Sequence, residues 1–299
     1  MKWVELSVEV HPEAVDAVAE VFRSHGTGGV AIEQPVTPDV DGEQVPHPTG
    51  LPIMKAYLAL SSSREEQIHR IEQDLWHLQA FGLSPVGEMQ RREIDEEDWA
   101  NAWKEHFHPL KVGRVVIKPT WRDWQSGPDE VIVELDPGMA FGTGLHPTTQ
   151  LMLQALQECV RPGMEVLDLG TGSAILAIAA ARLGATVVAM DVSEVAVKVA
   201  EDNVRANGLS DEIRVVHGSI EATAGLQFDL ILANIIAAVL AKLAEPLGQA
   251  LRPRGELLSC GIVEERAGLV REAYPAAGLN ITEERREGDW LLIRAQKAS

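Results

Sequence analysis

The segment DLGTG at residues 168–172 follows an apolar run and precedes a stretch of helix-forming residues. Gly170 and Gly172 let the backbone turn sharply there and let a ligand approach the main chain closely. A dinucleotide-binding pattern, G-x-G-x-x-G, would place a third glycine where this sequence has Ile175. Asp168 adds a negative charge where a pyrophosphate would lie. A cationic ligand therefore suits this corner better, and S-adenosylmethionine carries both a sulfonium and an ammonium group.

Asp191 is the last residue of the next apolar run, ATVVAMD. A carboxylate in this position can accept hydrogen bonds from both hydroxyls of a ribose, as it does in dinucleotide sites. NAD and S-adenosylmethionine both contain a ribose, so Asp191 does not separate them. Asp191 also precedes a predicted helix at 193–207, for which Ser193 is the better N-cap. The two roles of Asp191 are compatible.

Asn234 ends the apolar run FDLILAN, the fourth of the predicted parallel strands, and brings an amide to the edge of the predicted sheet. Its carbonyl oxygen is a hydrogen-bond acceptor, and it could orient an attacking amine whose lone pair must point at a methyl carbon. A helix cap before Ile235 and Ile236 explains this asparagine equally well. The residues alone leave both interpretations open.

A glycine-rich segment, DPGMAFGTGLHPTT at residues 136–149, precedes an amphipathic helix. Its composition suits neither a strand nor a helix and is typical of a loop that packs its backbone against a ligand. Phe141, Gly142 and Thr143 form the centre of this loop. Thr149 lies in the first turn of the predicted helix, where hydroxyls and free N–H groups can meet polar ligand atoms.

Other kinds of chemistry find little support in the sequence. His106 and His108 stand two residues apart and no H-E-x-x-H occurs, so we expect no metal site. His146 could act as a base, although a lone histidine more often has a structural role. Cys159 and Cys260 lack the spacing of a metal site or a disulfide framework, which fits a reducing compartment. The sequence also lacks a G-x-S-x-G elbow and a P-loop lysine.

From residue 165 onward, short apolar runs alternate with helical stretches. This alternation predicts a parallel sheet that is covered by helices on both faces. Two final runs are separated by Gly288 and Asp289, a hairpin signal, so the sheet should end in an antiparallel strand. The predicted strands are 165–170, 185–191, 212–218, 228–235 and 255–262, and the predicted helices are 173–183, 193–207, 237–250 and 264–277.

The first 94 residues follow a different plan, β-α-β-β-α-β, which is typical of a ferredoxin-like α+β domain with helices on one face of its sheet. The predicted strands are 3–10, 30–34, 54–61 and 86–94. The predicted domains are 1–94, a helical linker at 95–110, and 111–299. We assign the tryptophans in and after the linker to core or inter-domain packing: Trp99, Trp103, Trp121 and Trp124.

The chain of 299 residues is acidic, with 26 Lys and Arg against 45 Asp and Glu and a net charge of −19. Such a surface repels phosphate backbones, so direct nucleic-acid binding is not expected, and it attracts a basic partner. Residues 1–110 alone hold 20 acidic and 8 basic side chains, although solubility explains acidity as well. The longest uncharged run, 137–157, contains polar residues, and the N-terminus has no apolar signal core. We therefore expect no membrane span and a cytoplasmic location.

The DLGTG turn, Asp191, the Asn234 segment and above all DPGMAFGTGLHPTT resemble the bacterial ribosomal protein L-eleven methyltransferases, and the resemblance covers the whole chain. It implies a Rossmann-like class I methyltransferase domain, with a mostly parallel seven-stranded sheet and a C-terminal antiparallel hairpin, preceded by a small ferredoxin-like domain. It also implies transfer of methyl groups from S-adenosylmethionine to the α-amine and lysine ε-amines of a basic ribosomal protein, up to trimethylated products. The N-terminal domain would recognise that substrate, and the linker would let this domain reorient.

The resemblance also assigns roles to residues by their position. Thr149, Gly170, Asp191 and Asn234 match the family's cofactor contacts, Phe141, Gly142 and Thr143 match its loop over the cofactor, and Asp168 and Gly172 lie in the same glycine turn. The family pattern is G-[CT]-G-S-G, and here Ala174 replaces its last glycine, which is tolerable if φ is negative there. Three functions stay open: an amine methyltransferase for L-eleven or for another protein or small molecule, a nicotinamide oxidoreductase, and a non-catalytic S-adenosylmethionine-binding module.

Overall fold

The computed structural model describes residues 2–11, 14–25, 30–33, 50–59, 64–80, 87–95, 109–136, 144, 146–223 and 225–298. The described residues divide into two compact units. Those up to Asp95 belong to the first unit, and those from Pro109 onward belong to the second. Most of the predicted helical linker at 95–110 lies outside the described residues, so the linker stays a prediction.

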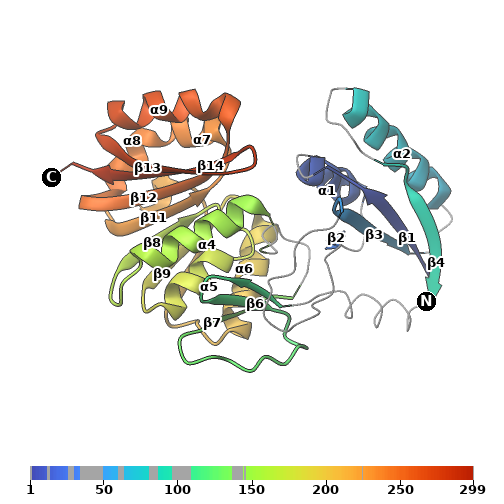
Figure 1. Cartoon of the computed structure of the whole chain (residues 1–299), viewed down its shortest axis with the longest axis horizontal. Coiled ribbons are helices and arrows are strands. Elements are labelled where there is room, and N and C mark those ends of the chain that lie inside the picture. The colour runs from blue at the N-terminus through green and yellow to red at the C-terminus, as the bar shows by residue number, and fades with distance from the viewer. Residues whose placement is uncertain are drawn as a thin grey trace. The chain divides into compact units, whose positions relative to one another are not determined.

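The described residues of the first unit form a four-stranded sheet and two helices (Figure 1). Its elements are β1 (Lys2–Glu9), α1 (Val15–Ser24), β2 (Val30–Glu33), β3 (Ile53–Ala59), α2 (Arg64–Ala80) and β4 (Gln90–Asp95). The strands lie in the order β2-β3-β1-β4, and every neighbouring pair runs antiparallel. This order confirms the predicted ferredoxin-like plan.

The core of the first unit lies between the sheet and its helices. Alternate residues of β1 (Val4, Leu6 and Val8) are buried, because successive side chains of a strand point to opposite faces. They pack in one cluster with Phe22 of α1 and Ile71 of α2, both of which are fully buried. This alternation explains how one face of the sheet comes to carry both helices.

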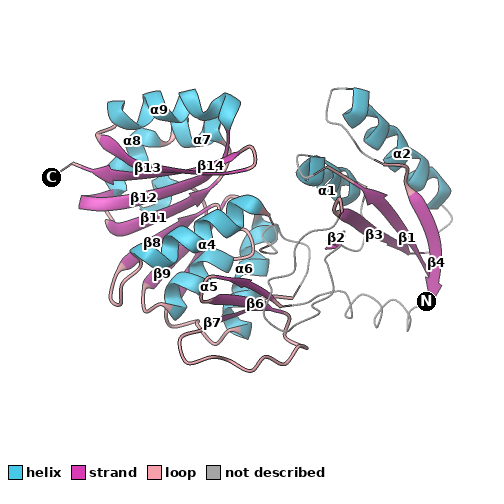
Figure 2. Cartoon of the chain, in the orientation of Figure 1, coloured by secondary structure: helices cyan, strands magenta, loops and turns pink. Residues whose placement is uncertain are grey.

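The second unit is built on a seven-stranded sheet (Figure 2). Its strands are β8 (Glu165–Leu169), β9 (Thr186–Asp191), β10 (Ile213–His217), β11 (Phe228–Asn234), β12 (Leu251–Val263), β13 (Leu279–Glu287) and β14 (Trp290–Lys297). They lie in the order β10-β9-β8-β11-β12-β14-β13. The pairs among β8 to β12 are parallel, whereas β14 runs antiparallel to both of its neighbours. The predicted parallel sheet with a terminal antiparallel hairpin is confirmed.

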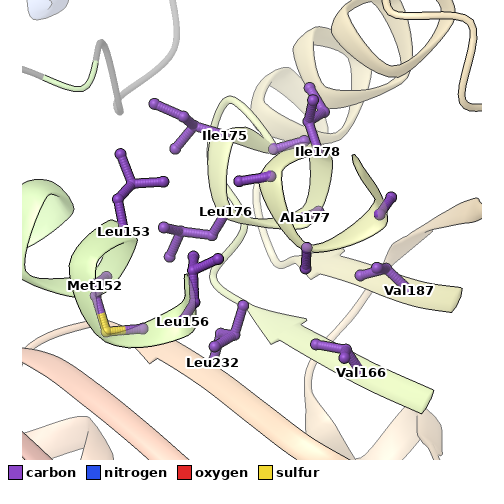
Figure 3. Close-up of a cluster of buried hydrophobic side chains, with 14 of the residues drawn as sticks. Met152, Leu153, Leu156, Val166, Ile175, Leu176, Ala177, Ile178, Val187 and Leu232 are labelled. Carbon is purple, nitrogen blue, oxygen red and sulfur yellow. The ribbon is translucent and has the colours of Figure 1, made fainter. Parts of the chain in front are cut away.

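Helices cover both faces of this sheet (Figure 1). One face carries α4 (Pro147–Cys159), α5 (Ile175–Arg182) and α6 (Glu194–Ala206), and the other carries α7 (Ala237–Lys242), α8 (Ala244–Ala250) and α9 (Ala267–Ala276). Neighbouring residues of a strand therefore enter two different cores: Leu232 packs on the first face and Ile231 on the second. Figure 3 shows the first core, in which Leu156 of α4 lies near Leu232. In the described part of the chain, no helix is both long and apolar enough to cross a bilayer.

A small sheet at the start of the second unit was not anticipated from the sequence. Its strands are β5 (Leu110–Val112), β6 (Val115–Lys118) and β7 (Val131–Glu134), in that order across the sheet. Ile117 and Val133 join the core around α4 and α5, so this sheet belongs to the second unit. Strands of three or four residues are too short for an apolar period to stand out. The half-buried Trp124 donates from Nε1 to Glu130 Oε2 (2.8 Å) and so packs within this unit.

The predicted helix at 237–250 is two helices, α7 and α8, which meet at Leu243. The break follows from Pro246, which has no backbone N–H to donate to the preceding turn. Proline is accepted near the start of a helix, and Pro246 is the third residue of α8. The predicted strand at 255–262 is also longer than expected, because β12 begins at Leu251.

Candidate active site

Three adjacent strands end at the same edge of the large sheet. The order β9-β8-β11 places the ends of these strands side by side, and all three run parallel. Gly170 directly follows β8, Asp191 ends β9 and Asn234 ends β11. Open α/β sheets bind ligands outside the carboxyl ends of their strands, at the point where the strand order reverses. The fold therefore brings these three predicted site residues together at such a point.

The turn after β8 depends on glycine. Gly170 has a φ of +74° and Gly172 a φ of +55°, a region that L side chains rarely adopt. A Cβ atom on Gly170 would lie 2.5 Å from Cγ2 of Ile235, the residue that follows β11. The N–H groups of Gly170 and Thr171 both donate to the carbonyl of Met190, at 2.8 and 2.9 Å, which holds the turn against β9. The backbone of this turn is thus fixed and close to the neighbouring strand ends.

Asp168 is a buried carboxylate directly behind this turn, with 1% of its surface exposed. Its Oδ2 accepts hydrogen bonds from Thr171 Oγ1 (2.6 Å) and from the N–H of Ala177 (3.2 Å). Its Oδ1 is also buried and has no hydrogen-bond partner among the described residues. Burial raises the pKa of Asp168 to about 6, since a charged carboxylate is poorly solvated in the interior. Among the described residues, one acceptor of this carboxylate is therefore unfilled.

Both oxygens of Asp191 are held by backbone N–H groups. Oδ2 accepts from Gly172 (3.0 Å), and Oδ1 accepts from Ser193 (2.9 Å). Ser193 is the N-cap of α6, and its hydroxyl accepts from the N–H of Ala196 (3.4 Å), which confirms the predicted cap. Each oxygen of Asp191 keeps a second lone pair, so the fixed carboxylate can still accept further hydrogen bonds.

The first turn of α4 contributes two buried hydroxyls. Thr148 and Thr149 are 2% and 1% exposed, and they follow Pro147 at the start of the helix as predicted. His146 is the N-cap of α4, and its side chain accepts from the N–H of Thr148, which gives this histidine a structural role. Asn234 donates from Nδ2 to Thr148 Oγ1 (3.2 Å) and thereby links β11 to α4.

The cap interpretation of Asn234 is wrong, because the N-cap of α7 is Ile236. Asn234 therefore remains available at the strand edge with its amide nitrogen bound to α4. The contact with Thr148 had no signal in the sequence beyond the helix-start pattern HPTT.

The glycine-rich loop is only partly described. Phe141, Gly142 and Thr143 lie outside the described residues, so their predicted place over the site stays a prediction. The loop departs from Asp136, whose carboxylate accepts from the N–H and the hydroxyl of Thr120 (2.7 and 2.8 Å). These two bonds fix the point at which the segment leaves the small sheet.

Two asparagines near the site were missed by the sequence analysis. Asn203 of α6 donates to the carbonyl of Ser173 (2.9 Å), next to the glycine turn. Asn207 exchanges hydrogen bonds with the backbone of Glu134, accepting at 2.9 Å and donating at 2.7 Å. Both side chains brace backbone from distant parts of the chain, and asparagines in and after a helix give no sign of such partners in the sequence.

Ala174 does not have the negative φ at which an alanine would be tolerable in this position. Its φ is +65° and its ψ is 18°, which is the left-handed region, and it is the N-cap of α5 without a side-chain cap. An L residue with a Cβ atom costs roughly 1–2 kcal/mol in this conformation, whereas glycine adopts it freely. The strain that a negative φ would have avoided is therefore present.

We predict that Ala174→Gly stabilises the protein. The relief of strain is partly offset by the larger entropy of an unfolded glycine, so the free energy of unfolding should rise by about 0.5–1 kcal/mol. Urea denaturation measures this change. Ala180→Gly in the interior of α5 is the matched control and should lower stability by about 1 kcal/mol or more. A lower stability for Ala174→Gly would contradict the strain at this position.

The strand order and the glycine turn together define the class of protein. Dinucleotide-binding sheets have the same reversal of strand order next to the first strand of the sheet. They carry a third glycine, however, at the position of Ile175, where α5 begins. A seven-stranded sheet in this order, with its one antiparallel strand in the sixth position between β12 and β13, is the plan of class I methyltransferases. No cluster of three or more metal-ligating side chains occurs among the residues that the structure describes. The chain is a class I S-adenosylmethionine-dependent methyltransferase.

Comparison with known proteins narrows this class to one family. The family model described as ribosomal protein L11 methyltransferase matches residues 2–298. Relatives of that name from Chloroflexus aurantiacus and Pelotomaculum thermopropionicum are 43% and 42% identical, and the matches cover 97% and 99% of both chains respectively. The crystal structure of a ribosomal protein L11 methylase from Lactobacillus delbrueckii subsp. bulgaricus superposes with a TM-score of 0.61 at 34% identity, covering 64% of this chain and 100% of that one. The chain belongs to the ribosomal protein L11 methyltransferase family.

Proposed function

We propose that this chain transfers methyl groups from S-adenosylmethionine to amino groups of ribosomal protein L11, up to trimethylated products. The observation that carries the proposal is the family match over residues 2–298, together with nearly full-length relatives that are named for this activity. The α-amine and lysine ε-amines are the proposed acceptors. Residues 1–94 are the proposed substrate-recognition domain and 111–299 the proposed catalytic domain, joined by a linker at 95–110.

Two features of the turn after β8 suit the cofactor. The buried Oδ1 of Asp168 offers an acceptor for an ammonium group. The main chain at Gly170 carries no side chain, and any Cβ there would collide with Ile235. We assign the cofactor to the following residues: Asp168, Gly170, Gly172, Asp191, Asn234 and Thr149, with Phe141, Gly142 and Thr143 over it. When bound, S-adenosylmethionine supplies a methyl group on a sulfonium, which is already a good leaving group.

The chain's own contribution to the reaction is position and shielding from water. An amine attacks through its lone pair, so a lysine with a pKa of about 10.4 must first lose its proton. Asn234 can accept an N–H of the neutral amine at its carbonyl oxygen and so direct the lone pair. A carboxamide does not titrate at ordinary pH, so Asn234 orients the amine and water takes the proton.

A transfer assay on a mixture of ribosomal proteins tests this function. The expected result is label from methyl-labelled S-adenosylmethionine in L11 alone, and binding of S-adenosylmethionine but not of NAD in calorimetry. Label in a different protein would identify that protein, and not L11, as the substrate. Binding without transfer would make the chain a non-catalytic module, and binding of NAD would overturn the class of reaction.

We predict that methylation of L11 slows with salt. Residues 1–110 hold 20 acidic and 8 basic side chains, so a basic substrate should be steered to this part of the chain. Raising the ionic strength from about 0.05 to about 0.5 M should lower kcat/KM for L11 about tenfold, while kcat changes little. The affinity for S-adenosylmethionine, measured at the same salt concentrations, is the control. A flat response of kcat/KM would leave solubility as the reason for the acidity.

A further inference from the structure

The hydroxyl of Thr148 lies between two side chains from different parts of the second unit. It is 2.7 Å from Nδ1 of His146, the N-cap of α4, and 3.2 Å from Nδ2 of Asn234, at the end of β11. Thr148 is 2% exposed, so water cannot readily replace either contact. The three residues form a chain of hydrogen bonds that ends on the proposed amine-orienting group.

The direction of this chain follows from the backbone. The N–H of Thr148 can only donate, and it points to Nδ1 of His146 at 3.3 Å. Nδ1 therefore carries no proton and accepts. Since Thr148 has a single hydroxyl proton and gives it to Nδ1, its oxygen can only accept from Asn234. The Asn234 amide therefore presents its nitrogen, and not its carbonyl oxygen, to Thr148 of α4.

A reversed amide would be disfavoured for the same reason. The carbonyl oxygen of Asn234 would then face Thr148 Oγ1, and neither atom would have a proton for the other. The correct orientation leaves the carbonyl oxygen for another donor. His146 is itself fixed, because its ring stacks edge-on against Trp290 with 4.9 Å between the ring centroids.

We infer that His146 and Thr148 are positioning residues that set the direction of the Asn234 carboxamide, so that its oxygen faces the incoming amine. This inference rests on the proposed function, in which Asn234 orients that amine. Neither His146 nor Thr148 needs to touch the substrate. Their effect passes entirely through Asn234.

Thr148→Val is the first test, because valine keeps the shape of threonine and removes the hydroxyl. The rate of methyl transfer to L11 at saturating cofactor and substrate should fall about tenfold, since the half-buried Asn234 loses the partner of its amide nitrogen and with it the preference for one orientation. Thr148→Ser keeps the hydroxyl and should stay within about twofold of the native rate. Thr186→Val is the matched control, because it makes the same substitution at the start of β9, at the end of the strand away from Asp191. This variant should have the native rate.

Two variants of His146 test the direction of the chain. His146→Asn keeps an acceptor near the position of Nδ1 and should retain most of the rate. His146→Phe keeps a ring against Trp290 but removes the acceptor, and should slow transfer by a few-fold to about tenfold. In the Thr148→Val background, His146→Phe should cause no further loss, because its effect requires the hydroxyl. A purely structural role would instead give additive losses.

The outcomes separate the inference from the function on which it rests. A native rate for Thr148→Val beside a slow Asn234→Ala overturns the positioning role alone. A native rate for Asn234→Ala itself overturns the proposed role of Asn234. Additive losses in the double variant, or a loss in Thr148→Ser equal to that in Thr148→Val, also overturn the inference. Thermal unfolding of each variant establishes that the rates refer to folded protein.

Discussion

Asn234→Ala is expected to lower the rate of methyl transfer about a hundredfold or more at saturating S-adenosylmethionine and L11. Small errors in the position of reacting groups have effects of this size, because the attack requires the lone pair of the amine to lie in line with the methyl carbon. Alanine keeps the backbone at the end of β11 but has no carbonyl to accept the amine. The loss should therefore appear in kcat.

The measurement for Asn234→Ala is the single-turnover rate of methyl transfer. The structural cost of the substitution is the bond to Thr148 Oγ1, worth about 1 kcal/mol, so the variant should remain folded. Asn280→Ala, at an exposed position of β13, is the matched control and should have the native rate. An Asn234→Ala variant with full activity would contradict the role assigned to this amide.

The affinity for S-adenosylmethionine is expected to fall about tenfold between pH 8 and pH 5. Burial raises the pKa of Asp168 to about 6, so the carboxylate is charged above that pH and neutral well below it. An ammonium group at Oδ1 favours the charged form, and about nine-tenths of the free protein would be protonated one unit below the pKa. Calorimetric titration across this range measures the effect.

Asp168→Asn is the control for this pH dependence. Its affinity should be lower than the native value at pH 8 and should change little down to pH 5. Because the folded-state pKa of Asp168 is raised, the protonated form favours folding, and this contribution is lost as pH rises through about 6. At pH 8 the charged, buried Asp168 therefore lowers the free energy of unfolding, by on the order of 3 kcal/mol at most. Asparagine carries no charge and avoids this cost, so the variant should be no less stable than the native chain at pH 8. If the affinity of the unsubstituted chain for S-adenosylmethionine did not vary with pH, the role of Asp168 would be contradicted.

The residues at the strand ends could be predicted because each one closes an apolar run. Parallel strands end at a common edge, so Gly170, Asp191 and Asn234 had to approach one another once the alternation of strands and helices was recognised. The ferredoxin-like plan of the first unit could be predicted from its order of elements, β-α-β-β-α-β. Patterns of this kind are local, and a sequence shows them directly.

The contacts that orient these residues could not be predicted in the same way. Thr148 and Asn234 are 86 positions apart, and nothing in either segment indicates which atom of the amide is bound. The φ of Ala174 is set by the turn between β8 and α5, so the sequence showed a departure from glycine without showing its strain. The small sheet of β5, β6 and β7 escaped notice because its strands are too short to show a period.

Intact mass spectrometry of purified L11 tests most directly whether this chain methylates amino groups of L11. L11 should be incubated with the chain and S-adenosylmethionine, beside a sample of L11 whose amines have been acetylated. Native L11 should gain mass in steps of one methyl group and acetylated L11 should gain none. The Asn234→Ala variant should produce the same products far more slowly. An unchanged mass of native L11, under conditions in which the chain binds S-adenosylmethionine, would contradict the account.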